Sequence, residues 1–271
     1  MTNPPRTAPE AATDLPLVAE LWYLDAPDLT DPDLLAALRE IRPDTEAKDG
    51  SLRVPHPLDD PDRPPLVTVV LPGSPLGQDG KALPDVSQTW DWAGAELALA
   101  PCRASVLVTE LLAEGRSAAD RVASLGAVLE VLIARTSPEA IHWARSQRVS
   151  DPASFGAGDL DGVINIRMYS DARAEDTLAM DTLGLHVFGL PDIQCHFRDR
   201  TPGEIAELLF ATAVYEFEAG DVIEDGNTIS GTDGEGRYVC RREASLLEPA
   251  RLVIDVDLGD PWAAGRRDRT G

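Results

Sequence analysis

The sequence predicts an α+β fold in which a largely antiparallel sheet is covered by helices. Strand-like segments occur in groups and as hairpins, and they do not alternate strictly with helices as they would in a parallel-sheet protein. The 271 residues are 43% hydrophobic, which is enough to form the core of one large domain or two small ones. A duplicated ferredoxin-like plait is the most specific arrangement we expect, although no internal sequence repeat marks it.

The domain organisation follows from composition. Residues 1–15 are rich in Pro and Ala without periodicity and are expected to form a disordered tail. Residues 16–256 are expected to form a single α+β domain, and residues 257–271 a loose, polar C-terminal tail. The polar stretch at 150–160 is the best candidate for a seam if the domain consists of two halves, and the sequence leaves both arrangements open.

In the first half, period-two alternation predicts a strand at Leu17–Asp25, where a turn signal follows. A capping oxygen near Thr30 and Pro32 in the first turn predict a helix that Pro43 stops. The other expected elements are strands at Leu52–Val54, Leu66–Leu71, Cys102–Glu110 and Ala140–Trp143, a short helix at Trp90–Leu97 and a long helix at Ser117–Ala134.

In the second half, the strongest local signal is the sequence Thr201-Pro202-Gly203-Glu204. It supplies a capping oxygen, a proline at the first helical position and a glutamate at the third, so it predicts a helix that ends at Gly220. The remaining expected elements are a strand at Gly162–Ser170, a hairpin formed by Thr228–Ser230 and Arg237–Arg241, and a last strand at Leu252–Val256.

The stretch Met180–Phe197 is the most constrained part of the chain, and its alternation predicts a hairpin. A turn at residues 189–192 would pair Phe188 with Ile193 and place His186 opposite Cys195 on the same face. A cysteine beside a histidine is the minimal arrangement for an activated thiolate, with Asp181 or Asp192 available to orient the imidazole. The alternative is that Cys195 and His186 are structural, and a register slip of one residue would separate them.

The same stretch carries a family resemblance. The run D-T-L-G-L-H-V-F-G-L-P-D-I-Q from Asp181, the P-G-E-I-A-E-L-L that follows it, and the glycine-containing runs at 220–231 and 259–265 resemble the C-terminal signature of a bacterial family known only as a domain of unknown function. The resemblance covers residues 162–265 well and the first half more loosely. It implies a soluble bacterial protein of mixed α/β fold, and it implies no activity, cofactor or catalytic residue.

Charge and cysteine content limit the plausible partners. The formal net charge is −23, which argues against nucleic acid and anionic membranes as ligands. No apolar run approaches 18 residues, so no membrane span is expected, and residues 1–14 lack the apolar core of a secretory signal. The three cysteines, Cys102, Cys195 and Cys240, are widely spaced, which predicts reduced thiols and a cytoplasmic location.

The segment Thr201–Gly236 contains nine acidic residues and no Lys, Arg or His. Such a segment is suited to bind a basic protein partner, because complementary charge accelerates encounter and selects the partner. The candidate binding residues are Glu216, Glu218, Asp221, Glu224 and Asp225. The spacing of a twelve-residue calcium loop is absent, so we predict a solvated acidic turn and no metal site.

Three function classes remain. The first is a non-catalytic binding protein that uses the acidic surface, for example in an immunity- or antitoxin-like role. The second is a small enzyme that uses Cys195 and His186, and the third is a structural or assembly protein that buries the helix at 201–220 in an oligomer. The sequence contains no nucleophile-elbow, zinc-protease, redox-cysteine or dinucleotide motif, which favours a protein without catalysis and without a cofactor.

Overall fold

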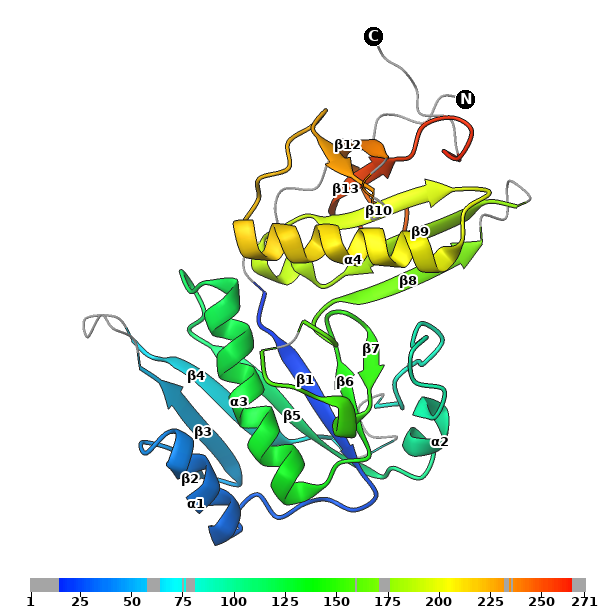
Figure 1. The fold of residues 1–271 in the computed structure, drawn as a ribbon. Helices are drawn as coiled ribbons and strands as arrows, with labels where there is room; N and C mark the ends of the chain where they lie inside the picture. The colour runs from blue at the N-terminus through cyan, green and yellow to red at the C-terminus, as the bar shows by residue number, and fades with distance from the viewer. Residues whose placement is uncertain are drawn as a thin grey trace, which may run out of the picture. The chain divides into compact units, whose positions relative to one another are not determined.

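The computed structural model describes residues 15–57, 64–74, 76, 81–158, 160–170, 176–231, 234 and 236–264. The chain forms two compact units, drawn in Figure 1. We call Pro16–Ile164 the N-terminal unit and the residues from Asn165 onward, together with Leu15, the C-terminal unit. Both units combine helices with mostly antiparallel strands, which confirms the predicted α+β class. The tail predicted at 1–15 lies, except for Leu15, outside the described residues.

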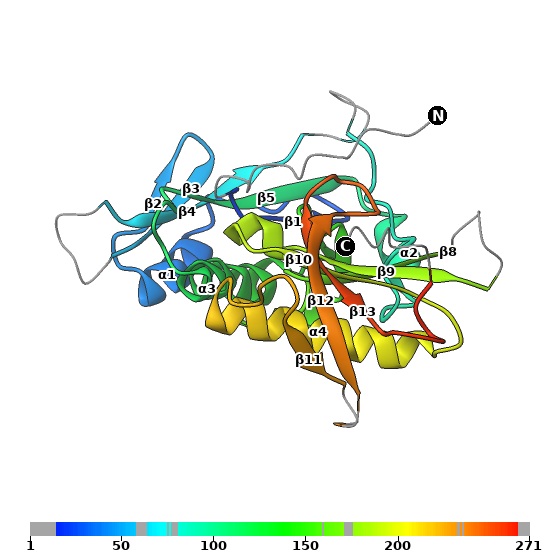
Figure 2. The ribbon, with the colours of Figure 1, turned by 90° about the horizontal axis from the view of Figure 1, so that it is seen from above.

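The N-terminal unit contains a seven-stranded antiparallel sheet in the order β2-β3-β4-β5-β1-β6-β7. Its strands are β1 (Val18–Tyr23), β2 (Glu46–Lys48), β3 (Ser51–His56), β4 (Leu66–Pro72), β5 (Ala104–Leu111), β6 (Ala140–Trp143) and β7 (Arg148–Ser150), and its helices are α1 (Pro32–Ile41), α2 (Ala95–Leu99) and α3 (Ala118–Thr136). The elements β1-α1-β4-β5-α3-β6, with the spatial order β6-β1-β5-β4, form a ferredoxin-like plait that β2, β3 and β7 extend. The helices α1 and α3 lie side by side on one face of the sheet (Figures 1 and 2).

Local capping chemistry sets the ends of these helices. The side chain of Asp31 accepts a hydrogen bond from the backbone N–H of Asp33 at the start of α1, within the capping sequence predicted near Thr30. Arg42 is extended at φ −143°, as expected for the residue before a proline, and it ends α1. Ser117 accepts from the N–H of Asp120 and begins α3 as predicted. The short strands β2 and β7 were not predicted, because three residues are too few to show a period.

The C-terminal unit contains a six-stranded sheet in the order β11-β12-β13-β10-β9-β8. Its strands are β8 (Asn165–Ser170), β9 (Leu178–Leu183), β10 (Asp192–Phe197), β11 (Thr228–Ser230), β12 (Arg237–Ala244) and β13 (Leu252–Asp257), and its long helix is α4 (Pro202–Ala219). Strands β10 and β13 pair in parallel, and the other neighbours are antiparallel. Three consecutive strands precede the single long helix, so the plait occurs in the N-terminal unit and is not repeated here.

Helix α4 runs along β9 and β10 (Figures 1 and 2). Its start is the predicted capping box, in which Thr201 accepts from the N–H of Glu204 and the Glu204 side chain accepts from the N–H of Thr201. The helix ends before Gly220, which has φ 86°. Its buried side includes Ile205, Leu208, Leu209 and Ala213, which supply an apolar face for the sheet. None of the described helices is long and apolar enough to cross a lipid bilayer.

The central hairpin exists, but its predicted turn and register are wrong. Strands β9 and β10 pair with Cys195 opposite Met180, and residues 184–191 connect them. This connection contains a 3-10 helix at Leu185–Phe188 between two glycines with positive φ, Gly184 (147°) and Gly189 (74°). The predicted strand partner of Cys195, His186, therefore lies in the 3-10 turn and not in a strand.

The described part of the expected C-terminal tail is hydrogen-bonded to the sheet. The N–H of Arg198 donates to the carbonyl of Trp262 (2.9 Å), and the N–H of Ala264 donates to the carbonyl of His196 (3.0 Å). Leu258 and Ala264 are buried. Residues up to 264 thus extend the C-terminal unit beyond the predicted limit at 256, and residues 265–271 lie outside the described part.

Candidate functional site

One face of the C-terminal sheet carries a row of buried polar side chains. Arg167 on β8 lies opposite Asp181 on β9, which lies opposite Gln194 on β10, which in turn lies opposite Asp255 on β13. Directly opposed residues on neighbouring strands point to the same face, so the four side chains share it. All four are buried.

Arg167 and Asp181 form a two-pronged ion pair. The Nε of Arg167 donates to Oδ1 of Asp181 (3.0 Å), and its Nη2 donates to Oδ2 (2.7 Å). A third donor of the same guanidinium, Nη1, reaches the carbonyl of Glu248 (2.9 Å). The paired side chains are 1% and 0% exposed, so this interaction is fully screened from water. Its geometry is that of a rigid structural pair.

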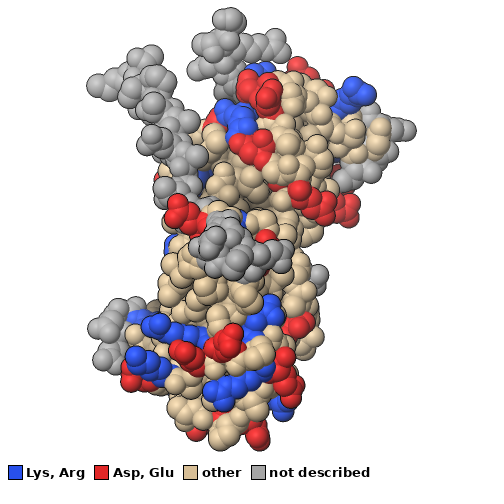
Figure 3. Space-filling view, turned by 90° about the vertical axis from the view of Figure 1, so that its left-hand side faces the viewer, with Lys and Arg blue, Asp and Glu red and all other residues tan. Residues whose placement is uncertain are grey.

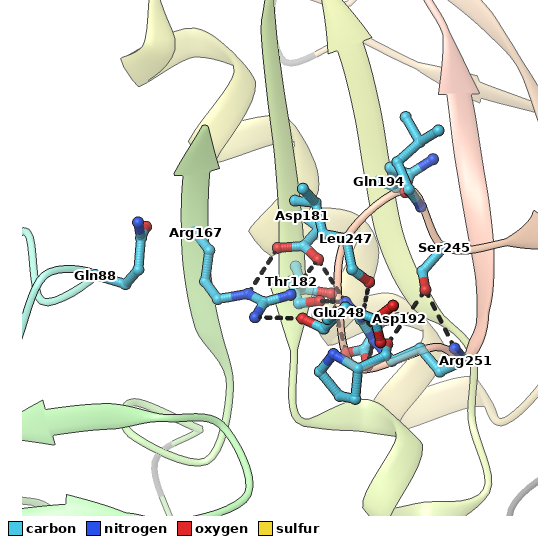
Figure 4. Close-up of polar contacts among 12 residues, drawn as sticks. Gln88, Arg167, Asp181, Thr182, Asp192, Gln194, Ser245, Leu247, Glu248 and Arg251 are labelled. Carbon is cyan, nitrogen blue, oxygen red and sulfur yellow. Dashed lines mark hydrogen bonds and ion pairs between the residues drawn. The ribbon is translucent and has the colours of Figure 1, made fainter. Parts of the chain in front are cut away.

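Arg251 joins this pair to a second aspartate, and Figure 4 shows the side chains of Arg167, Asp181, Asp192 and Arg251 pointing toward one another. Its Nη2 donates to Asp181 Oδ2 (2.5 Å) and its Nε to Asp192 Oδ2 (2.8 Å). Burial alone would lower the pKa of Arg251, but Asp192 and Asp181 outweigh it and raise the pKa. Two arginines therefore balance two aspartates, and we call these four residues the buried ion-pair network.

Asp192 also fixes His186. Its Oδ1 accepts from the backbone N–H of Leu185 (3.0 Å) and the hydroxyl of Thr182 (3.2 Å), and its Oδ2 accepts from Nδ1 of His186 (3.0 Å). Burial favours the protonated carboxyl, but the hydrogen bonds and charges of His186 and Arg251 lower the pKa of Asp192 overall. The Asp192 carboxylate thus holds the 3-10 turn against the start of β10.

The proposed Cys195–His186 pair is not formed. Cys195 follows Gln194 on β10, so its side chain points to the opposite face from the ion-pair network, whereas His186 is bound to Asp192. Cys195 is 0% exposed, and all three cysteines are buried thiols outside any disulfide. Asp192, one of the two aspartates suggested for orienting the imidazole, does contact His186.

Of the acidic residues predicted for binding, Glu216 is buried and the other four are exposed. Glu216 is 0% exposed, and its Oε1 accepts from the N–H of Ile223 (2.9 Å). Burial raises the pKa of its carboxyl. Glu216 lies four residues after Thr212 on the inner side of α4, so it cannot contribute to a contact surface. The prediction of Glu216 as a binding residue is therefore wrong.

The exposed acidic residues border an aromatic side chain. Along the outer side of α4, Glu207, Ala211, Tyr215 and Glu218 follow one another at helical spacing and are all exposed. The side chains of Tyr215 and of Val222, which follows the helix, are 53% and 42% exposed. We define the acidic face as this outer stripe of α4 together with the exposed residues of the turn after it, Asp221, Val222, Glu224 and Asp225.

Arg242 on β12 fixes the turn of the acidic face. Its Nη2 pairs with Asp221 Oδ2 (2.8 Å), its Nη1 donates to the carbonyl of Ile223 (3.3 Å), and its backbone N–H donates to Asp225 Oδ1 (3.0 Å). By contrast, the carboxylates of Glu207, Glu218 and Glu224 make no hydrogen bond or salt bridge to any residue in the described ranges. The acidic face therefore combines a fixed backbone with three carboxylates that are open to an external cation.

Sequence reasoning missed the ion-pair network, although one signal was present. Arg167 and Asp181 both occupy positions within strands of alternating pattern, where charged side chains on a covered face require partners. Their common partner Arg251 lies 70 residues from Asp181 in the sequence, so spacing could not identify it. Within the described residues, no group of three or more His, Cys, Asp or Glu side chains is arranged to hold a metal ion.

Comparisons with known proteins matched part of the C-terminal unit to a family model. Neither the search of curated proteins nor the search of solved structures found a match to this chain. A family model does match residues 181–257, a range that includes Asp181, Asp192, Arg251 and the acidic turn. This part of the chain matches the family described as a domain of unknown function (DUF4261), which confirms the resemblance predicted from the sequence.

Proposed function

We propose that the protein binds a basic protein partner through the acidic face of the C-terminal unit and that this binding involves no catalysis. The observation that carries the proposal is the set of three exposed carboxylates, Glu207, Glu218 and Glu224, that have no internal hydrogen bond or salt bridge to described residues and lie on the same helix-and-turn segment as the exposed Tyr215. A cationic partner could form direct ion pairs with these three carboxylates.

The chemistry of these residues supports protein binding. An exposed tyrosine contributes a large contact area at little cost in conformational entropy, and tyrosine is among the residues that dominate binding energy at interfaces. Surrounding carboxylates accelerate the encounter with a basic protein and disfavour acidic ones. Because the inner side of α4 packs on the sheet and Arg242 fixes the following turn, the surface is organised before binding.

The two alternative functions receive less support. The enzyme hypothesis required Cys195 beside His186, and the register of β9 and β10 separates them. The assembly hypothesis required burial of α4 against a second copy. Two copies that met through the acidic face would bring like charges together, which costs free energy unless cations intervene. A cytoplasmic immunity- or antitoxin-like role, in which the acidic face neutralises a cationic protein, is the biological setting we favour.

The test is affinity capture from the native cell lysate at low and high salt. We would compare the wild-type protein, the double variant Glu218→Lys/Glu224→Lys, and a charge-matched control, Glu40→Lys/Glu96→Lys, whose exposed residues lie in the N-terminal unit. The proposal expects a basic protein that the wild type and the control retain at low salt and that the Glu218/Glu224 variant loses. Retention of the same proteins by all three, independent of salt, would exclude the acidic face as the binding surface.

A further inference from the structure

The N-terminal unit contains a cavity of about 340 Å³ whose chemistry differs from that of the acidic face. Arg42 after α1, His56 at the end of β3, and Arg116 before α3 contribute to its wall, and Asp120 and Ser124 line it from the first turns of α3. Elements that are distant in the sequence thus place two guanidinium groups around one concavity. The cavity lies wholly within one unit and does not depend on the proposed function.

Arg42 is held in place by its neighbours. Its Nε donates to Nδ1 of His56 (3.1 Å), and its Nη1 donates to the carbonyl of Ile41 (2.7 Å). Because Nδ1 of His56 accepts, the ring proton lies on Nε2, which donates to the hydroxyl of Thr68 (2.9 Å). The remaining donor group of Arg42, Nη2, makes no hydrogen bond to the residues that the structure describes. A side chain fixed in this way needs little ordering to bind a ligand.

The formal charges of the described residues that line the cavity sum to a positive value. Burial and the charge of Arg42 lower the pKa of His56 to about 4, so His56 is neutral at physiological pH. Arg116 donates to the carbonyl of Pro64, and the carboxylate of Asp120 accepts from the hydroxyl of Ser117 (2.7 Å). Among the described lining residues, Arg42, Arg116 and Asp120 are the charged ones. The chain as a whole has a net charge of −23, so a cavity with a positive lining differs from the chain's overall charge. Figure 3 shows a face of the N-terminal unit on which Lys and Arg lie among acidic residues.

We propose that this cavity binds the phosphoryl group of a small molecule. Arginine presents planar paired donors that match phosphate oxygens, and it retains its charge at any physiological pH. The hydroxyl of Ser124 adds a neutral donor to the wall. The volume lies at the lower end of the range for small-molecule sites, which suits a phosphoryl group on a small organic fragment.

The experiment is a calorimetric titration of the full-length protein with inorganic phosphate at low ionic strength and pH 7.5, with acetate as a parallel titrant. The variants are Arg42→Ala, Arg42→Lys and Arg116→Ala, and the control is Arg53→Ala, which removes an exposed arginine of β3. Circular dichroism melts establish that each variant is folded. Arg42→Lys keeps the charge without the fork, so it separates the loss of recognition from the loss of structure.

The proposal expects saturable phosphate binding by the wild type and by Arg53→Ala. Loss of either guanidinium should weaken binding by about tenfold or more, as is typical for a charged hydrogen-bond partner, and Arg42→Lys should be intermediate. Three results would overturn the proposal. These are the absence of saturable phosphate binding, equal affinity in Arg42→Ala and Arg53→Ala, and acetate binding as tight as phosphate binding, which would indicate a carboxylate site instead.

Discussion

The buried ion-pair network and the acidic face both belong to the C-terminal unit and both contain several carboxylates, yet the environments of these carboxylates are opposite. Asp181 and Asp192 are fully buried and each is paired with arginine, whereas Glu218 and Glu224 are exposed and make no salt bridge to a described residue. A buried carboxylate without a partner is strongly destabilising, while an exposed one costs almost nothing. The comparison shows that burial and ion-pair partners, and not residue type, distinguish the structural carboxylates from the exposed ones.

The largest effect is expected for Asp181→Ala. The substitution would leave Arg167 and Arg251 buried without their shared carboxylate, so we expect the free energy of unfolding to fall by about 3–5 kcal/mol. Urea denaturation of the variant and the wild type measures this change in the free energy of unfolding. The control is Glu224→Ala, which removes an exposed carboxylate and should change the free energy of unfolding by less than about 0.5 kcal/mol. Equal losses of unfolding free energy for the two substitutions would contradict the distinction between buried, paired carboxylates and exposed ones.

A second prediction concerns the loss of folding stability at low pH. The pKa of Asp192 is lowered in the folded state, so the unfolded chain binds more protons at low pH. The stability that Asp192 contributes is therefore complete above its ordinary pKa of 3.8 and is lost as the pH falls through its lower folded value. Denaturant midpoints between pH 2 and 6 should fall with acid in the wild type and fall less in Asp192→Asn. A parallel decline in both proteins would assign the acid sensitivity to other groups.

Glu216 should behave in the opposite way. Its pKa is raised in the folded state, so its contribution to stability is complete below its ordinary pKa of 4.5 and is lost as the pH rises through the higher folded value. Glu216→Gln keeps an oxygen that can accept from Ile223, so we expect stability equal to or greater than that of the wild type at pH 7. Thermal melts at pH 4 and pH 7 measure this. A less stable variant at pH 7 would show that the ionised carboxylate has a partner.

The smallest effect on stability is expected on the acidic face. Glu218→Lys/Glu224→Lys changes exposed side chains that make no salt bridge to a described residue, so its free energy of unfolding should stay within about 0.5 kcal/mol of the wild type. Urea denaturation of the variant and the wild type provides the measurement. A large loss would mean that these glutamates stabilise the fold, and the face would then resemble the buried network.

Features with local causes were predicted from the sequence, and features with distant causes were not. The capping box of α4 involves residues three apart and was predicted correctly. The register of β9 and β10 depends on a 3-10 turn that buried Asp192 stabilises through contacts with Leu185 and Arg251, so alternation alone could not reveal it.

The inner and outer sides of α4 were also ambiguous from the sequence. Apolar residues surround much of the helix, and Glu216 and Glu218 both read as surface residues. Packing against β9 and β10 decided between them and buried Glu216. The α+β class was predictable because groups of strands can be counted without knowledge of their register, whereas the ion-pair network joins Arg167, Asp181 and Arg251 across three separate segments.

The most direct test of the central claim is the amount of basic protein captured by the two charge-matched double variants from one lysate at low salt, quantified by mass spectrometry against the wild type. The account predicts that Glu40→Lys/Glu96→Lys captures the wild-type amount and that Glu218→Lys/Glu224→Lys captures at least about tenfold less. Equal capture by the two variants would contradict the assignment of the acidic face as the binding surface.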